Sequence, residues 1–287
     1  MKILVIGANG QLGTDVVQRF VEAGHDVTGI NHDDEFDVQS EAKVNRVVDG
    51  NRPDAVVNTS AMHHVERCEK DPGAAFAVNG LGARNVARAC NRVGSTLLHI
   101  STDYVFDGGK NEPYSEGDLP LPLNVYGITK LAGEHFVRSI ADQYYVVRTS
   151  GLYGANPCRA KGGLNFVQLM LKLAKERDEV RVVTDEVLTP TCTADLAEQL
   201  LMLLESGAPW GTYHATAQGA CSWFEFAAEI FRLAGCDVKL EPARPGEFPM
   251  KVPRPSYSVL RNKALQELDL DNLPTWQDCL AKFLKNN

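Results

Sequence analysis

The residues that decide the fold stand at the start of the chain: Lys2-Ile-Leu-Val-Ile-Gly7-Ala-Asn-Gly10-Gln-Leu-Gly13. The largely apolar run from Lys2 to Ile6 is typical of a short strand that is covered on both faces. The glycine turn leads into an amphipathic helix that is expected to extend to about Ala23. Strand, glycine turn and helix in this order predict a dinucleotide-binding unit.

Each glycine has its own part in this prediction. Gly7 allows the tight turn, Gly10 lets the main chain approach a pyrophosphate, and Gly13 lets the helix pack closely against the strand. The N-terminus of the helix attracts phosphate groups. Because the spacing is GxxGxxG rather than GxGxxG, an ordinary turn between a strand and a helix would also explain this segment taken alone.

Beyond this unit, apolar runs alternate with helical patterns up to residue 149. Further strands are expected near 25–30, 54–58, 96–100 and 144–149, and helices near 40–50, 72–94 and 126–139. This alternation predicts an α/β fold of the Rossmann type, with a doubly wound parallel sheet and right-handed crossovers. Ligands of such sheets lie at the carboxyl ends of the strands. The glycines, Ser101-Thr102 and residues 59–61 all fall at such ends.

A candidate catalytic set lies in the stretch Ser101 to Lys130, STDYVFDGGKNEPYSEGDLPLPLNVYGITK. Thr102 follows a buried strand, and Tyr126 and Lys130 lie one turn apart on the same helix face. A tyrosine can deliver a proton to a carbonyl oxygen as hydride reaches the carbon, and a nearby ammonium lowers the pKa of the phenol. A Tyr and a Lys at this spacing are more often a surface pair, so the assignment depends on the strand ends around them.

The end of the second strand bears on the choice of cofactor. It reads Asn31-His32-Asp33-Asp34, with no Arg or Lys to take a 2′-phosphate, which slightly favours NADH without excluding NADPH. Asp37-Val38 follows at a turn that can border the adenine. A cap for the helix from Ser40 explains Asp37 equally well.

The loop after the third strand begins with the small residues 59–61, which would let the main chain lie against a cofactor. Two neighbouring histidines, His63 and His64, cannot both face one metal ion from a helix, so no metal site is expected. Asn79, on the next predicted helix, either braces this loop or only satisfies main-chain groups.

Composition narrows the class of protein. The chain has 287 residues, 44% of them hydrophobic and 23% charged, which is ordinary for a soluble globular protein with a sizeable core. The net charge of -8 argues against a general nucleic-acid or membrane-surface binder. Seven scattered cysteines without CxxC spacing are typical of reduced thiols in a cytoplasmic protein. We see no signal peptide and no run long enough to span a membrane.

After Arg148 the pattern changes. A loop at 151–163 precedes a helix near 164–177, a strand near 179–183 and an extended segment at 185–193. A helix near 194–204, a strand near 210–214 and a helix near 222–234 follow, and the last residues hold a Pro- and Arg-rich loop and short helices. This part is expected to contain a second, smaller unit.

Several segments together resemble a known family. GANGQLG, ISTDYVFDG, YGITKLAGE, RTS-x-x-YG, NFVQLML, TPT-x-TADLA, GTYHATAQGACSWFEFAAEIF and RPSYSVL follow in the order seen in dTDP-4-dehydrorhamnose reductases, which are extended short-chain dehydrogenases/reductases. The resemblance covers essentially the whole chain. It implies an NAD(P)-binding Rossmann domain of residues 1–150 with 186–214, and a smaller C-terminal α/β substrate-binding domain of residues 151–185 with 215–287.

The resemblance also implies roles for particular residues. Thr102 would hydrogen-bond the C4 carbonyl, Tyr126 would donate the proton, and Lys130 would grip the nicotinamide ribose. The family's cofactor positions fall on Gly7, Asn9, Gly10, Gln11, Leu12, Gly13, Asp37, Val38, Ala61, Tyr126 and Lys130. Looser candidates on the substrate side are Val65, Tyr104, Asn165 and Arg254, with Lys251 as a further basic residue; solvated surface charge explains the two basic residues equally well.

The implied activity is NADPH- or NADH-dependent reduction of the C4 keto group of a dTDP-4-keto-6-deoxy sugar, giving dTDP-L-rhamnose or a close relative for polysaccharide or glycoside assembly. Gly151 stands where the family commonly has Trp, and Met62-His63 replaces a usual Tyr-Thr pair. Both changes fall on the substrate side and leave the exact nucleotide sugar open. A nucleotide sugar is the expected partner, a homodimer is allowed, and a cytoplasmic location is expected.

Two alternatives compete with this interpretation. The chain also resembles the NADP-binding regulatory β-subunit of methionine adenosyltransferase, which lacks the same Trp. The intact set of Thr102, Tyr126 and Lys130 favours catalysis, because a binding module has no need of a proton donor. A related epimerase or dehydratase is disfavoured, because Tyr104 rather than Glu follows Asp103.

Overall fold

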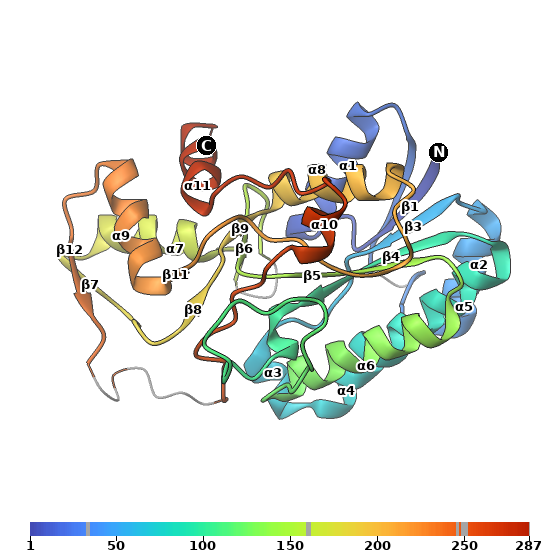
Figure 1. Ribbon diagram of the computed structural model, residues 1–287, viewed down its shortest axis with the longest axis horizontal. Helices are drawn as coiled ribbons and strands as arrows, with labels where there is room; N and C mark the ends of the chain where they lie inside the picture. The colour runs from blue at the N-terminus through green and yellow to red at the C-terminus, as the bar shows by residue number, and fades with distance from the viewer. Residues whose placement is uncertain (33–34, 159–161, 245–246, 248–251, 287) are drawn as a thin grey trace.

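The computed structural model describes residues 1–32, 35–158, 162–244, 247 and 252–286. A six-stranded sheet in the order β10-β5-β4-β3-β1-β2 lies at its centre (Figure 1). All neighbouring strands of this sheet are parallel. The strands are β1 (Lys2–Ile6), β2 (Asp26–Ile30), β3 (Ala55–Asn58), β4 (Thr96–Thr102), β5 (Tyr144–Thr149) and β10 (Gly211–His214). The predicted fold class, a Rossmann-type parallel sheet, is confirmed.

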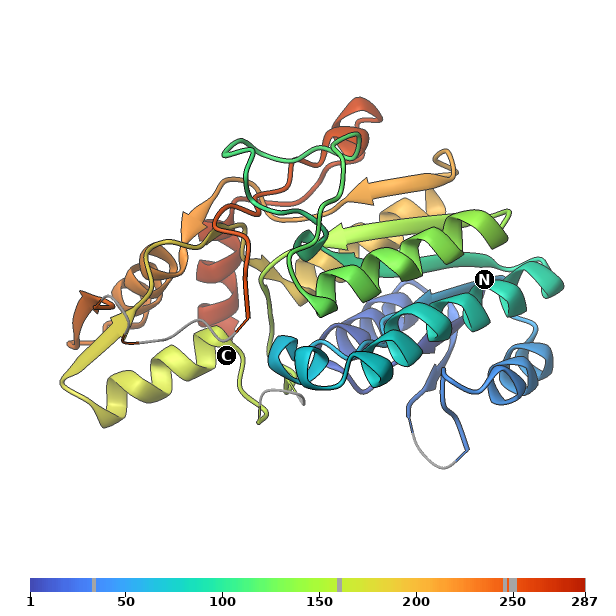
Figure 2. The ribbon, with the colours of Figure 1, turned by 90° about the horizontal axis from the view of Figure 1, so that it is seen from below.

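Helices cover the sheet on both faces because each central strand is apolar on both sides. Ile3 and Val5 of β1 face one core, and Leu4 and Ile6 face the other, as the alternation of a strand requires. Figures 1 and 2 show different helices on the two faces, and the two cores give their identity. Those on the first face are α1 (Gln11–Glu22) and α8 (Thr193–Glu205), and those on the second are α2 (Glu41–Asn51), α5 (Ala83–Val93) and α6 (Val125–Ile140).

The helix predicted at 72–94 is one continuous path but not one regular helix. It consists of α4 (Pro72–Phe76), a π-helical turn (Ala77–Gly82) and α5. The side chain of Asn79 on the π turn accepts the N–H of Met62 at 2.8 Å and donates to its carbonyl oxygen at 3.0 Å. Asn79 therefore ties the loop after β3 to this helix by satisfying main-chain groups of Met62, so both alternatives raised by the sequence describe the same contact.

A second core lies beside the main sheet, toward the left of Figure 1. Phe226, Ile230 and Leu280 are fully buried in it, together with residues of a small parallel strand pair. Its elements are α7 (Phe166–Glu176), β7 (Glu179–Val182), α9 (Trp223–Ala234), β12 (Lys239–Pro242) and α11 (Trp276–Asn286). Both α7 and α9 begin with a capping box, at Asn165 and at Ser222.

Short elements join the two cores. Residues 185–193, predicted as one extended segment, form β8 (Val187–Leu188) and β9 (Thr191–Cys192), which pair with β11 (Cys221–Ser222) and β6 (Leu152–Tyr153). The chain then returns to the main sheet, where β10 pairs with β5. The remaining short helices are α3 (Val65–Lys70), a 3-10 turn (Asp103–Val105) and α10 (Lys263–Glu267).

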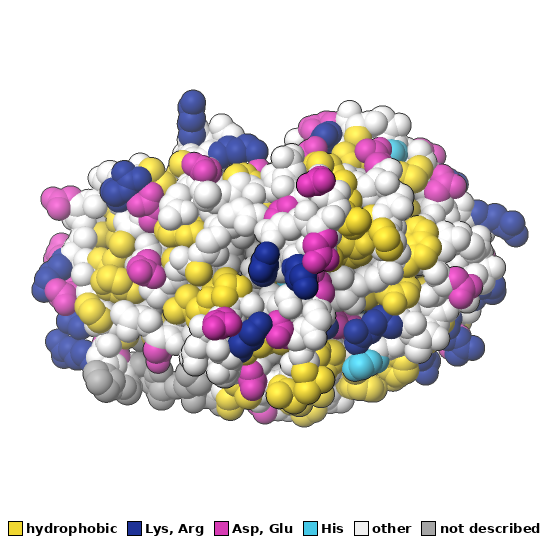
Figure 3. All heavy atoms as spheres, in the orientation of Figure 1, with side chains coloured by type: hydrophobic (Ala, Val, Ile, Leu, Met, Phe, Trp, Pro, Cys, Tyr) yellow, Lys and Arg dark blue, Asp and Glu magenta, His cyan; other side chains and the backbone are white. Residues whose placement is uncertain are grey.

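The molecular surface carries charged side chains of both signs, as the composition of the chain led us to expect. Figure 3 shows basic and acidic side chains interspersed over one face of the molecule. Among the residues that the structure describes, no helix is both long and apolar enough to cross a membrane.

Candidate active site

Thr102, Tyr126 and Lys130 come together at the carboxyl end of β4. Thr102 is the last residue of β4 and is 5% exposed, and its hydroxyl lies close enough to the Tyr126 phenol to act on its pKa. Lys130 lies one turn further along α6 and is 2% exposed. The structure therefore places the three predicted catalytic side chains around one point.

Local packing fixes the start of α6 against β4. Asn124 caps the helix, since its Oδ1 accepts the N–H of Gly127 at 2.9 Å. A Cβ atom on Gly127 would collide with the main-chain oxygen of Tyr104, so only glycine lets the first helical turn approach this closely. The ring edge of Tyr104 then packs on Tyr126, with centroids 5.7 Å apart and planes at 70°.

The Tyr126 phenol is held in its neutral form. Burial raises the pKa of Tyr126, and the charge of Asp103 acts in the same direction. The nearby Thr102 hydroxyl lowers this pKa by a smaller amount than burial raises it. A neutral phenol in the first turn of α6, beside the end of β4, is suited to donate a proton.

The ammonium group of Lys130 is buried against the main chain. Its Nζ donates to the carbonyl oxygen of Ile100 at 2.6 Å. Burial lowers the pKa of Lys130 to about 8, although Glu134, one turn further along α6, opposes this shift. Lys130 thus titrates near working pH, as expected for a lysine that assists proton transfer.

Two polar residues of this site were missed by sequence reasoning as functional candidates. Asp103 is 3% exposed and accepts hydrogen bonds from three hydroxyl groups. Thr149 ends β5 in register with Thr102, and its buried Oγ1 has no hydrogen-bond partner among the described residues. No sequence pattern marks either residue; their positions at parallel strand ends were the available signal.

The glycine turn lies at the end of β1 in the predicted form. Gly7 has a φ of 84°, and a Cβ atom there would lie 2.7 Å from Thr59 Oγ1. A Cβ atom on Gly13 would collide with the main-chain oxygen of Gly7, which explains the close approach of helix and strand. Gly10 precedes α1 as its N-cap and supplies no side-chain cap, so the first N–H groups of α1 remain available.

The other predicted residues of this turn differ in exposure. Asn9 is exposed and its N–H donates to Asn31 Oδ1 at 2.7 Å, whereas Leu12 is buried. Gln11 Nε2 is buried and has no hydrogen-bond partner among the described residues. An unpartnered donor beside an open helix N-terminus fits an anionic dinucleotide.

Asp37 and Val38 lie beside the ends of β1 and β2. Val38 is buried and its carbonyl oxygen accepts from Asn85 Nδ2 at 2.9 Å. The side chain of Asp37 accepts the N–H of Gln39 at 2.9 Å, while Ser40 caps α2. The cap predicted for Asp37 is therefore made by Ser40 instead.

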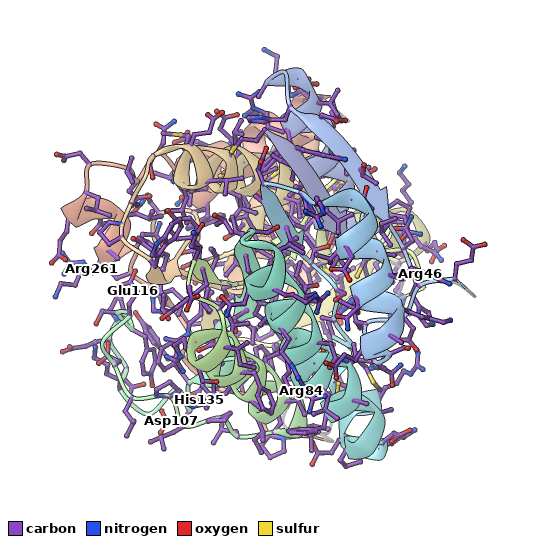
Figure 4. All side chains as sticks on the ribbon, turned by 90° about the vertical axis from the view of Figure 1, so that its right-hand side faces the viewer. Arg46, Arg84, Asp107, Glu116, His135 and Arg261 are labelled. Carbon is purple, nitrogen blue, oxygen red and sulfur yellow. The ribbon has the colours of Figure 1, made fainter. Side chains whose placement is uncertain are left out.

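The cavity at the tip of β2 contains basic residues that the sequence argument overlooked. It has a volume of about 450 Å³ and is lined by Asn31, Phe36, Lys43 and Arg46, among others. Arg46 Nη2 donates to the carbonyl oxygen of Glu35 at 2.8 Å, and Figure 4 shows Arg46 on the far side of the molecule from Asp107. Lys43 and Arg46 thus bring positive charge to the tip of β2, which the tip sequence itself does not contain. Asp33 and Asp34 lie outside the described residues.

The loop after β3 follows the carboxyl end of that strand, next to β1 and β4 in the sheet. Ala61 is partly buried within this loop, and Val65 begins α3. His63 Nε2 lies 3.6 Å from Cys158 Sγ. Within the described part of the chain, no group of three or more His, Cys, Asp or Glu side chains could hold a metal ion.

Arg254, a substrate candidate in the C-terminal segment, lies near Tyr104. Arg254 Nη2 donates to Glu66 Oε1 at 2.6 Å and lies 3.9 Å from Glu186 through Nη1. The charge of Arg254 also lowers the pKa of Tyr104, although burial raises that pKa more strongly. Lys251 lies outside the described residues.

Asn165 is committed to a structural contact. Its Oδ1 accepts the N–H of Gln168 at 3.0 Å and its Nδ2 donates to the carbonyl oxygen of Gly154 at 2.7 Å. The side chain is 3% exposed. Its evident function is to cap α7, and any contact with a substrate would have to use the remaining amide proton.

Comparisons with known proteins agree on one family. A family model described as RmlD substrate binding domain matches residues 1–287. The spore coat polysaccharide biosynthesis protein SpsK of Bacillus subtilis is 37% identical over 99% of this chain and 97% of its own length. A dTDP-4-dehydrorhamnose reductase of Streptomyces griseus is 40% identical over 97% of this chain and 91% of its own.

Solved structures show the same likeness. A dTDP-4-dehydrorhamnose reductase of Clostridium acetobutylicum superposes with a TM-score of 0.94 at 41% identity, covering 100% of this chain and 99% of its own. That of Bacillus anthracis, in complex with NADP, gives a TM-score of 0.92 at 37% identity with the same coverage. A UDP-glucose 4-epimerase of Thermotoga maritima, at 20% identity, shares the fold with a TM-score of 0.83 and covers 99% of this chain and 98% of its own.

Proposed function

This chain belongs to the dTDP-4-dehydrorhamnose reductase family, and on that premise we propose that it reduces the C4 keto group of a dTDP-4-keto-6-deoxy sugar. The product is dTDP-L-rhamnose or a close relative, which serves polysaccharide biosynthesis. The reductant is NADPH or NADH, and a relative is known in complex with NADP. One observation carries the proposal: Thr102 ends β4, Tyr126 and Lys130 lie one turn apart at the start of α6, and Lys130 Nζ is bonded to the carbonyl oxygen of Ile100 on β4.

The residues present fit a dinucleotide. The open N-terminus of α1, the positive φ of Gly7 and the unpartnered Gln11 Nε2 form a cradle for phosphate groups. We assign the same function to Asn9, Leu12, Asp37, Val38 and Ala61 by their places around this cradle. When bound, the nicotinamide supplies a hydride.

Each catalytic side chain has a distinct proposed part. Tyr126 donates its phenolic proton to the carbonyl oxygen, and burial keeps this proton in place until then. Lys130, fixed by the Ile100 carbonyl, holds the nicotinamide ribose and stabilises the phenolate that forms. Thr102 lies beside the phenol and positions the carbonyl.

The second core supplies the substrate side of the proposal. We assign residues 1–150 with 186–214 to cofactor binding and 151–185 with 215–287 to substrate binding. Tyr104, Val65 and Arg254 then line the cleft from several elements, with Asn165 at its edge as the cap of α7. Arg254 would meet a phosphate group by exchanging its contact with Glu66.

Gly151 restricts what the sugar pocket can contain. Its φ is 56°, and a Cβ atom there would lie 2.9 Å from Leu188 Cδ1 and 3.0 Å from Pro190 Cα. The tryptophan expected at this position in the family does not fit this main-chain path. The sugar must therefore be held by other groups, which makes a panel of nucleotide sugars the appropriate substrate test.

Purified protein should consume NADPH or NADH when given dTDP-4-keto-6-deoxy-L-mannose. Tyr126→Phe should lower kcat by about a hundredfold or more while cofactor affinity changes little, because only the proton donor is removed. The matched control is Tyr145→Phe, which removes a hydroxyl bonded to Ala208 within the core of the other sheet face. Cofactor binding without turnover on any sugar of the panel would instead favour an NADP-binding regulatory subunit.

Location and assembly complete the proposal. All seven cysteines are free thiols, which supports a reducing compartment and hence a cytoplasmic location. A homodimer is compatible with the family, and sedimentation of the purified protein would test it.

A further inference from the structure

Arg254 lies between two carboxylates that come from different parts of the chain. Its Nη2 donates to Glu66 Oε1 at 2.6 Å, and its Nη1 lies 3.9 Å from Glu186 Oε2. Glu66 belongs to the first turn of α3, whereas Glu186 directly precedes β8. The side chains of Arg254 and Glu66 are 32% and 33% exposed, so a ligand from solvent can reach this ion pair.

The ion pair is anchored next to the start of α6, the helix that carries the proposed proton donor. The carbonyl oxygen of Pro253 accepts a hydrogen bond at 2.9 Å from Nδ2 of Asn124, the N-cap of α6. On the side of α3, Glu69 Oε2 accepts the N–H of Val125 at 3.1 Å. An anion that contacts Arg254 would therefore lie beside the proposed catalytic set.

The guanidinium atom that a phosphate group needs most is already in use. An arginine binds phosphate most strongly with two N–H donors side by side. Both edges of a guanidinium that offer two such donors include Nη2, together with Nη1 or with Nε. Because Nη2 of Arg254 is bonded to Glu66, a phosphate on either edge would meet the Glu66 carboxylate. Two negative charges at this distance repel each other, so the two anions compete for Arg254.

The two carboxylates differ in how firmly they are held. Glu186 is 13% exposed, and its Oε2 accepts a hydrogen bond from Trp223 Nε1 at 3.2 Å. Glu66 is more exposed, and its second oxygen, Oε2, lies 3.1 Å from His64 Nδ1. Glu66 therefore has another partner when it leaves Arg254, whereas Glu186 is fixed by the indole. Glu66 is the carboxylate that can be displaced.

We propose that Glu66 competes with the diphosphate of the sugar nucleotide for Arg254 and thereby sets the affinity for this substrate. The inference deepens the proposed function and rests on it. Without substrate, Glu66 balances the charge of Arg254. With substrate, the diphosphate takes Nη2 and Glu66 stays beside His64. A ligand that lacks the two negative charges of a diphosphate gains too little from Arg254 to displace Glu66, which makes Glu66 a specificity-determining residue.

The test is Glu66→Gln, which keeps the shape of the side chain and removes its charge. We expect the KM for the sugar nucleotide to fall about fivefold with kcat nearly unchanged, an effect of the size of a partly exposed ion pair. The dissociation constant of dTDP, measured by titration calorimetry in the presence of NADPH, should fall by the same factor. This second measurement requires no turnover.

Glu229→Gln is the matched control. Glu229 Oε1 accepts from Arg232 Nη2 at 2.6 Å on α9, so the control breaks an ion pair of the same geometry away from the proposed site. It should leave both constants unchanged. A further comparison uses Arg254→Gln, which should raise the KM about tenfold. Adding Glu66→Gln to Arg254→Gln should change the KM little, because no guanidinium remains to compete for.

The outcomes separate competition from other functions of Glu66. A fall of both constants in Glu66→Gln, absent in Glu229→Gln and in the Arg254→Gln background, supports the proposal. An unchanged or raised KM in Glu66→Gln overturns it, because the carboxylate would then orient Arg254 for the substrate. An equal fall in the control or in the Arg254→Gln background overturns it as well.

Two further results have a defined meaning. Glu66→Ala is measured in the same way and decides the question if Glu66→Gln lacks the circular dichroism of the wild type. Failure of the wild-type protein to reduce any sugar nucleotide would contradict the proposed function, whereas the dTDP titration would still decide whether Glu66 opposes the binding of a diphosphate.

Discussion

Two buried carboxylates flank the end of β4, and they are held in different ways. Asp103 is surrounded by hydroxyl groups of Thr102, Ser150 and Ser258. Glu134 forms a two-point ion pair with Arg148, through Nε at 2.9 Å and Nη2 at 2.7 Å. Glu134 and Arg148 are at most 1% exposed. Asp103 is solvated by neutral hydroxyl donors, whereas Glu134, which also accepts from Ser101 Oγ at 2.6 Å, has a full positive charge beside it.

The difference bears on the stability of the fold. A buried ion pair becomes very costly when one partner is lost, because the other charge remains uncompensated in the interior. A carboxylate bonded only to hydroxyls leaves no opposite charge behind when it is neutralised. Changes at Glu134 should therefore destabilise the fold more than changes at Asp103.

The largest expected effect follows from Glu134→Gln. This change leaves Arg148 without its counter-charge and should lower the free energy of unfolding by about 3–5 kcal/mol. Urea unfolding monitored by circular dichroism measures this loss. The double variant Glu134→Gln with Arg148→Met should recover most of it, because no unpaired charge remains.

One result would contradict the explanation of this loss by an unpaired charge. If the double variant is as unstable as Glu134→Gln alone, the loss comes from packing and not from an unpaired charge. The ring of Phe106, which lies 5.2 Å below the Arg148 guanidinium, would then be the first contact to examine.

A smaller effect is expected from Ser258→Ala. It removes one hydrogen bond to the Asp103 carboxylate and leaves the other two hydroxyls in place, so the free energy of unfolding should fall by about 2 kcal/mol. Ser139→Ala, at an exposed serine on α6, serves as the control and should change stability by less than about 0.5 kcal/mol. A loss as large as that of Glu134→Gln would erase the distinction between the two carboxylates.

The smallest expected effect is on the pH dependence of the free energy of unfolding. It comes from His214, which lies beside Arg148 of the ion pair. Burial, together with the charge of Arg148, lowers the pKa of His214 to about 3. The unfolded chain takes up a proton at this histidine below about pH 6.5, whereas the folded chain does not. The free energy of unfolding therefore falls by about 1.4 kcal/mol for each pH unit below that value. Wild type should therefore lose stability more steeply between pH 6 and pH 5 than His214→Gln, by about this amount.

Unfolding in urea at the two pH values measures both slopes. His135→Gln is the control, because His135 is exposed on α6 (Figure 4) and should leave the slope of the wild type unchanged. Equal slopes in wild type and His214→Gln would mean that His214 accepts a proton in the folded state despite its burial.

The sequence pattern of neighbouring residues was sufficient to predict the strands of the main sheet and the places of the proposed catalytic residues. The apolar runs predicted the five strands of the first 149 residues, and Thr102, Tyr126 and Lys130 were expected at a strand end and on the next helix. The structure places them there, because strand ends and one-turn helix spacing are properties of nearby residues.

Contacts between distant residues could not be predicted in this way. Arg148 contacts Glu134, fourteen positions away in the sequence, and His214, sixty-six positions away. Asp103 accepts a hydrogen bond from Ser258, which lies in the C-terminal part of the chain. Lys43 and Arg46 reach the cavity beside Asn31 from α2, although the strand tip contains no basic residue. The π turn at Asn79 likewise depends on the loop at Met62.

The central claim is that this chain delivers hydride to C4 of its sugar while Tyr126 supplies the proton. NADPH that carries deuterium at C4 of the nicotinamide, incubated with enzyme and dTDP-4-keto-6-deoxy-L-mannose, tests it most directly by nuclear magnetic resonance of the product. We predict deuterium at C4 of the sugar with wild type and almost none with Tyr126→Phe. Deuterium at another carbon, or equal labelling with both proteins, would contradict this account.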